Sequence, residues 1–179
     1  TGRSTTQITN SLIENNTAHG NQSGNCTNSD GCGGGGIKVR AGTIVISNST
    51  IRNNRSDTQY GGGMQIIYGS NAYLNSVVID SNYAYKDGGG IYASWSYLNG
   101  TEMDVRDNDS QFGHGGGLAL RGSLADIDNS NFEGNSTSTP ADPDEGEMGF
   151  GGGIYINNYD YEEETQDGGG EINIISTTI

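Results

Sequence analysis

A run of three glycines followed by an aliphatic residue recurs along the chain. The runs begin at Gly34, Gly61, Gly88, Gly115 and Gly151, and the first three intervals are 27 residues each. A fixed period in this range is the sequence signature of a solenoid, in which a repeat buries its apolar face only by stacking on the next one. The chain is therefore expected to fold as a stack of similar turns, with one repeat in each turn.

The residues that follow each glycine run alternate between apolar and other side chains, as in residues 37–39 and 64–66. Alternation with a period of two indicates a strand whose first and third side chains share a face. A second apolar pair follows, for example Ile44 and Ile46, and no ten-residue stretch has helical spacing. We predict an all-β fold, a right-handed parallel β-helix (solenoid) with about 27 residues and three short strands per turn.

A second motif places an asparagine three residues after an apolar residue. The pairs are Ile13 and Asn16, Ile51 and Asn54, Ile79 and Asn82, Val105 and Asn108, and Phe132 and Asn135. Asparagine amides stacked about 4.8 Å apart on successive turns can hydrogen-bond to one another along the axis. Glycine is favoured where the backbone needs a positive φ or approaches a neighbouring turn closely. Both motifs are therefore interpreted as structural, and a glycine-rich phosphate site is not expected because no strand–loop–helix fingerprint is present.

Together the two motifs resemble the repeats of the chlamydial polymorphic outer membrane proteins, in which a Gly-Gly-small-aliphatic tetrad alternates with a Phe-x-x-Asn tetrad. Here the tetrads read GGGI, GGGM and GGGL, and IENN, IRNN, IDSN, VRDN and FEGN, so only the last keeps the phenylalanine. The resemblance covers nearly the whole chain. It implies a right-handed β-helix with a surface-exposed adhesive or structural role.

The domain organisation follows from the repeats. Residues 1–179 are predicted to form one β-helix domain with loop insertions at 14–33, 136–150 and 157–167. The sequence starts in mid-repeat and ends at Ile179 without a visible cap. Uncapped solenoid ends present unpaired strand edges, so we expect a segment of a longer protein or a unit that pairs end to end with copies of itself.

The charge of the chain limits the classes of partner that it is expected to bind. The formal net charge is −14, and no basic patch is present that could release counterions from an anionic polymer. Nucleic acid is therefore not expected as a partner, and no segment has the length and apolarity of a transmembrane span. Carbohydrate and further β-helix segments are the partners that this composition favours.

Sequons and cysteines indicate an extracellular or cell-surface location. Asn15, Asn21, Asn25, Asn48 and Asn99 are the predicted glycosylation sites, whereas the sequons at Asn54, Asn108 and Asn135 occupy the ladder position, where a glycan cannot be accommodated. The alternative is that the repeat multiplied one accidental sequon. Cys26 and Cys32 lie in one polar loop and are predicted to form a disulfide, with a zinc site that includes His19 as the alternative.

Acidic residues gather in the two later insertions. Asp142, Asp144, Glu145 and Glu147 are candidate Ca²⁺ ligands, and residues 160–164 add further carboxylates. No EF-hand spacing or calcium-binding nonapeptide is present, and acidic loops are commonly only solvated. No other cofactor is expected.

Aromatic residues suggest a contact surface. Tyr92 and Tyr155 occupy positions predicted to face outward, and Trp95 and Tyr97 follow closely. Flat aromatic faces on a rigid sheet can stack on sugars or on a neighbouring protein, although tyrosine is also a good strand former. These four residues are the predicted ligand or lateral-contact residues.

The function predicted from the sequence is an extracellular structural or adhesive module, N-glycosylated, in a cell-surface fibre, appendage or large adhesin. The alternative is a polysaccharide-binding or polysaccharide-cleaving β-helix that uses carboxylates such as Asp104 and Asp126. We predict no catalytic residues, because no nucleophile–base pair is evident. Ice binding is ranked last, because regular Thr-x-Thr columns are absent.

Overall fold

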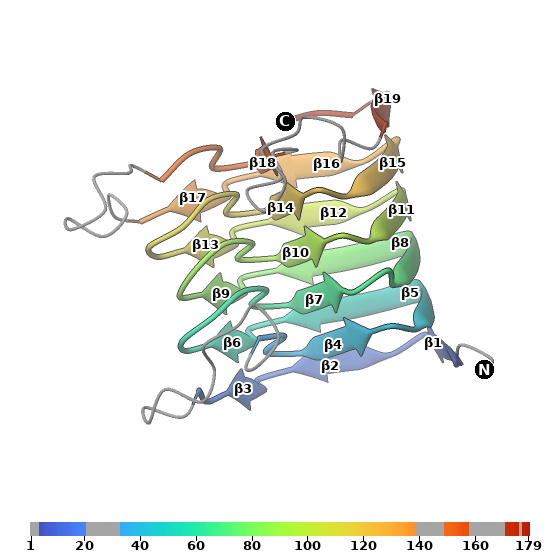
Figure 1. Cartoon of the computed structure of the whole chain (residues 1–179), viewed down its shortest axis with the longest axis horizontal. Coiled ribbons are helices and arrows are strands. Elements are labelled where there is room, and N and C mark those ends of the chain that lie inside the picture. The colour runs from blue at the N-terminus through green and yellow to red at the C-terminus, as the bar shows by residue number, and fades with distance from the viewer. Residues whose placement is uncertain (1–3, 21–32, 139–148, 158–170, 176) are drawn as a thin grey trace.

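The computed structural model describes residues 4–20, 33–138, 149–157, 171–175 and 177–179. Every regular element in this part of the chain is a β-strand, and the strands stack in parallel from one turn to the next (Figure 1). Three sheets run along the stack, with nine, five and five strands, and we call them sheets A, B and C. The predicted all-β parallel β-helix is confirmed.

The strands divide among the sheets as follows. Sheet A contains β1 (Thr5–Thr9), β2 (Leu12–Glu14), β5 (Thr43–Arg52), β8 (Asn71–Asp80), β11 (Tyr97–Thr101), β12 (Asp104–Arg106), β15 (Leu124–Asp128), β16 (Asn131–Glu133) and β19 (Ile172–Ile175). Sheet B, on the left in Figure 1, contains β3 (Thr17–Ala18), β6 (Arg55–Ser56), β9 (Tyr83–Ala84), β13 (Asp109–Ser110) and β17 (Ser136–Thr137). Sheet C contains β4 (Ile37–Arg40), β7 (Met64–Ile67), β10 (Ile91–Ser94), β14 (Leu118–Arg121) and β18 (Ile154–Asn157).

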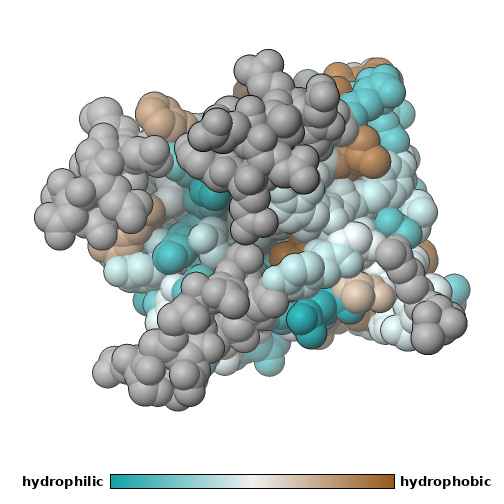
Figure 2. Space-filling model, in the orientation of Figure 1, coloured by the Kyte–Doolittle hydropathy of each residue, from teal (hydrophilic) through white to brown (hydrophobic). Residues whose placement is uncertain are grey.

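The core is a set of aliphatic columns between the sheets. The residues that alternate inward in sheet C pair directly, as Met64 does with Ile91, and both are fully buried. In sheet A, Ile51 pairs with Ile79 in the same way. On the described part of the face in Figure 2, hydrophilic residues and separate hydrophobic patches are interspersed. A narrow apolar interior can therefore stabilise this fold, because each turn buries its aliphatic residues against the turns on both sides.

Two details differ from the sequence-based expectation. The second and third expected strands are continuous in β5 and β8, each ten residues long, and bend at Asn48 (φ 47°) and Ser76 (φ 52°). The two-residue strands of sheet B were not predicted. Among them, β3 and β17 lie within the ranges predicted as loop insertions, 14–33 and 136–150, and two paired residues leave no periodic signal in the sequence.

The three glycines of each run have different environments. The first has a positive φ, for example 70° at Gly88. A Cβ on the second, Gly89, would lie 2.5 Å from the carbonyl carbon and oxygen of Asp109 in sheet B. A Cβ on the third, Gly90, would lie 3.1 Å from the amide carbon of Asn108. The glycine run therefore lies close against the backbone of sheet B and against the asparagines.

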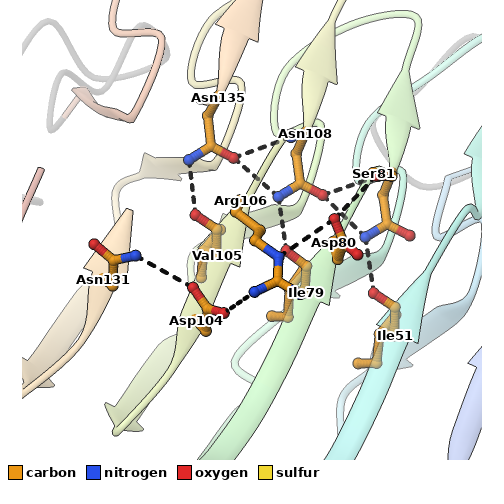
Figure 3. A network of polar contacts seen from close by, with 11 residues as sticks. Ile51, Ile79, Asp80, Ser81, Asp104, Val105, Arg106, Asn108, Asn131 and Asn135 are labelled. Carbon is orange, nitrogen blue, oxygen red and sulfur yellow. Dashed lines mark hydrogen bonds and ion pairs between the residues drawn. The ribbon is translucent and has the colours of Figure 1, made fainter. Parts of the chain in front are cut away.

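The asparagines form the predicted ladder (Figure 3). Each side-chain amide donates to the Oδ1 of the asparagine in the next turn, over 3.0, 3.1, 3.0 and 2.9 Å along Asn16, Asn54, Asn82, Asn108 and Asn135. The amide also donates to a backbone carbonyl, as Asn108 does to Ile79 over 2.9 Å. Asn54, Asn82 and Asn108 are at most 1% exposed. The two sequence motifs therefore meet in space, because the third glycine makes room for the ladder.

Candidate functional site

The four predicted contact residues lie on two surfaces. Tyr92 and Tyr155 pair through Ala119 on the outer side of sheet C. Trp95 directly follows β10 at the bend from sheet C to sheet A, and Tyr97 begins β11. The structure therefore does not bring the four residues together as one surface.

Tyr92 is not available to a ligand, and its predicted role as a contact residue is wrong. Its side chain does point away from the main core, yet it is only 2% exposed, because it packs in a second apolar cluster with Ile67 and Ala119. The ring of Tyr60 stacks on it with 4.4 Å between centroids. Burial also raises the pKa of the Tyr92 phenol. Strand alternation identifies the side of the sheet but cannot reveal a second layer that covers it.

A polar and aromatic cluster surrounds this layer. Buried Asp87 forms an ion pair with Arg121 over 2.8 Å and accepts from the backbone N–H of His114 over 2.8 Å. Although burial lowers the pKa of Arg121, attraction to Asp87 and nearby phenols outweighs it, and the net shift is upward. The His114 ring stacks on Tyr155 at 4.3 Å and on Phe150 at 5.4 Å. These contacts hold successive turns together, so Tyr155 packs within the protein on one ring face.

Several exposed aromatic residues lie instead at and beside the bend between sheets C and A. Trp95 is 45% exposed and Tyr68, at the equivalent bend of the preceding turn, is 41% exposed. On the adjoining outer face of sheet A, Tyr73 and Tyr97 make an edge contact with 5.8 Å between centroids. We call these four residues the aromatic corner. Tyr68 and Tyr73 were not among the predicted site residues, although Tyr68 precedes Trp95 by 27 residues, which is the repeat period.

One carboxylate is fixed at the edge of the aromatic corner. Asp126 accepts hydrogen bonds from the amide of Asn173 over 2.9 Å and from the hydroxyl of Tyr97 over 2.7 Å. These bonds lower the pKa of Asp126, and the bond to Asp126 raises the pKa of Tyr97. Asp126 is therefore held ionised, with further lone pairs open to hydroxyl donors.

Replacing Tyr97 by phenylalanine is expected to raise the pKa of Asp126 towards its usual value of about 4. The pKa of Asp126 is lower in the folded protein than in the unfolded chain. The bond to Tyr97 therefore stabilises the fold at pH values above the unfolded pKa, and this stabilisation is lost as the pH falls through the folded pKa. NMR titration of the Asp126 carboxyl carbon measures the shift. Tyr73→Phe is the control, because the Tyr73 hydroxyl makes no described hydrogen bond to Asp126, and an unchanged titration in Tyr97→Phe would contradict the assignment.

The carboxylates considered for polysaccharide cleavage are engaged in different contacts. Asp104 lies on β12, where it accepts from Arg106 over 2.5 Å and from Asn131 over 3.3 Å (Figure 3). Arg106 also lies 3.7 Å from Asp80 of the preceding turn. Asp126 lies on the other segment of sheet A, and its lowered pKa is opposite to the raised pKa that a general acid needs. The geometry of these two residues thus gives no support to an acid–base pair.

The predicted glycosylation sites differ in accessibility. Asn15 and Asn48 are exposed at bends with φ of 57° and 47°, whereas Asn99 is half-buried within β11. Asn54 and Asn108 are buried in the ladder, as expected. Asn21, Asn25, the predicted disulfide between Cys26 and Cys32 and the candidate Ca²⁺ ligands Asp142, Asp144, Glu145 and Glu147 lie outside the described residues.

Within the described ranges there is neither a cluster of metal-binding side chains nor a helix that could cross a membrane. No group of three or more His, Cys, Asp or Glu side chains there is arranged to hold a metal ion. Across the same ranges, no helix has the length and apolarity needed to span a membrane.

Comparisons with known proteins add no functional assignment. No family model matches the chain, and no curated protein or solved structure is significantly similar to it. The solenoid with turns of about 27 residues is therefore a finding of the structure, and the resemblance to a particular repeat family depends on the two motifs alone.

Proposed function

We propose that this β-helix is a structural and adhesive module of an extracellular surface protein, within a cell-surface fibre, appendage or large adhesin. The observation that carries the proposal is the continuity of hydrogen bonding along the axis. The asparagine ladder joins Asn16 to Asn135, and three parallel sheets extend beside it. Bending such a stack would stretch main-chain and side-chain bonds in several columns at once, so the module is a stiff spacer that carries exposed groups at fixed positions.

Two further features agree with this role. The paired tetrads resemble those of the chlamydial polymorphic outer membrane proteins. Asn15 and Asn48 present sequons at exposed bends, where a glycan would not interrupt a sheet. The partners that we propose along the axis are copies of the chain or neighbouring β-helix segments, because a parallel strand extends a ladder by adding to its edge.

Electron microscopy of the native material, with mass spectrometry of the same sample, tests this proposal. We expect filaments or elongated surface projections, and glycans on peptides that contain Asn15 and Asn48. The ladder residues Asn54 and Asn108 are the internal control, because buried asparagines should carry no glycan. Dispersed, unglycosylated monomers would contradict the proposed role.

A further inference from the structure

Tyr68 and Trp95 occupy a backbone conformation that large side chains rarely adopt. Their φ values are 59° and 49°, in the left-handed region. The residues at the equivalent bends of the flanking turns are Ala41 (φ 53°) and Gly122 (φ 53°). Glycine would adopt this backbone conformation without strain, so the conformation of the bend does not explain why two aromatic residues occupy it. Strained residues of this kind are commonly retained where the side chain has a function.

The indole ring of Trp95 has a defined orientation relative to the next turn. A Cβ added to Gly122 would lie 2.8, 2.9 and 2.9 Å from three consecutive atoms of the six-membered ring. Near-equal distances to adjacent ring atoms place that point over the face of the ring and not at its edge. One face of Trp95 therefore rests on the glycine of the next turn, and the 45% exposure of the side chain belongs largely to the other face.

The remaining aromatic residues extend this surface onto sheet A. Tyr68 occupies the equivalent bend of the preceding turn, and the guanidinium carbon of Arg40 lies 5.1 Å from the centroid of its ring. The edge contact between Tyr73 and Tyr97 and the bond from Tyr97 to Asp126 hold the adjoining residues in place. The aromatic corner thus combines flat apolar rings with an ionised acceptor in a preorganised arrangement.

We propose that the aromatic corner binds a neutral polysaccharide chain, with a sugar ring stacked on the free face of Trp95 and Asp126 accepting from sugar hydroxyls. Sugars present apolar C–H faces together with hydroxyl donors, which matches rings beside a fixed carboxylate. Tyr68 and Trp95 occupy equivalent bends of successive turns, about 4.8 Å apart along the axis, so the surface suits an extended chain. The proposal rests on the adhesive function proposed above and names its ligand class.

The charge of the protein excludes an acidic polysaccharide from this surface. The net charge of −14 repels polyanions; of the two arginines beside this surface, Arg40 is stacked on Tyr68 and Arg121 is paired with Asp87. Asp126 adds a fixed negative charge at the edge of the site. A ligand that supplies hydroxyl donors without negative charge is the one that matches both features.

Intrinsic fluorescence provides a direct measurement, because Trp95 is the single tryptophan of the chain. The full chain is titrated with three neutral oligosaccharides, cellohexaose, mannohexaose and xylohexaose, and with hexagalacturonate as the anionic comparison. We expect a saturable change in Trp95 emission with at least one neutral oligosaccharide and none with hexagalacturonate. Isothermal titration calorimetry supplies the affinity of variants that lack the fluorophore.

The decisive variant is Trp95→Gly. Glycine is the native residue at the equivalent bend of the next turn, so the urea midpoint should stay unchanged or rise while the dissociation constant increases at least about tenfold. The control is Tyr85→Ala, which removes a ring of similar exposure (38%) located after β9, away from the aromatic corner. Its affinity should match that of the native chain.

Binding of hexagalacturonate alone, absence of binding to all four oligosaccharides, or native affinity in Trp95→Gly would each overturn the inference. Glycosylated filaments in the microscopy experiment without oligosaccharide binding would leave the structural function standing and remove only this ligand. Dispersed monomers that bind a neutral oligosaccharide would support this ligand and contradict the structural function.

Discussion

Replacing Asn108 by alanine is expected to lower the free energy of unfolding by about 4 kcal/mol. The Asn108 amide donates to Asn135 and to the carbonyl of Ile79, each over 2.9 Å. Its oxygen accepts from the backbone and the side chain of Asn82, over 2.9 and 3.0 Å. Alanine would remove all four bonds from a buried site and leave the backbone N–H of Asn82 without this acceptor, and each buried group that loses its partner costs about 1–3 kcal/mol. The Oδ1 of Asn135 would keep the bond from the backbone N–H of Asn108.

Urea denaturation of the native chain and the variant measures the effect. Asn131→Ala is the matched control, because Asn131 is half-buried and its side chain makes one bond of 3.3 Å, to Asp104. The control should lose less than about 1 kcal/mol. A loss in Asn108→Ala no larger than the loss in Asn131→Ala would show that the ladder does not stabilise the stack.

The repeat motifs were the predictable part of the fold. A side chain that recurs in every turn meets its own copies, so a recurring asparagine predicts a ladder and a recurring apolar pair predicts a column. The same reasoning predicted that Asn54 and Asn108 would be buried in the ladder. What the motifs could not show is that the third glycine of each run, such as Gly90, lies against the ladder, because that contact joins different parts of successive turns.

The candidate site was only partly predictable, because the side chains carried at the equivalent bends differ from turn to turn (Ala41, Tyr68, Trp95 and Gly122) and the layer that covers sheet C does not recur in every turn. Trp95 was predicted as a contact residue and is exposed, whereas Tyr92, three residues earlier, is covered by Tyr60. Tyr60 comes from the segment before a glycine run, and no spacing rule relates it to Tyr92. The strained φ of Tyr68, which marks the aromatic corner, is likewise invisible until the backbone is known.

The glycine run offers the second large effect, in Gly89→Ala. A Cβ at this position would lie 2.5 Å from the carbonyl carbon and oxygen of Asp109 and 2.5 Å from the carbonyl oxygen of Gly116. All three are backbone atoms, those of Asp109 in sheet B and that of Gly116 in the next glycine run, so relief requires these backbone segments to move apart. We expect a loss of about 3 kcal/mol in the free energy of unfolding, measured by urea denaturation.

The control for this steric argument is Gly42→Ala. There the nearest atom to an added Cβ is the carbonyl oxygen of Ser4 at 3.4 Å, and the backbone has no positive φ. Both variants reduce the entropy of the unfolded chain by the same amount, which alone would stabilise each by about 0.4–1 kcal/mol. The difference between them therefore isolates the native-state contact. If the two variants have equal stability, the glycine runs are not required for close approach, and the recurrence of their second glycine would need another physical cause.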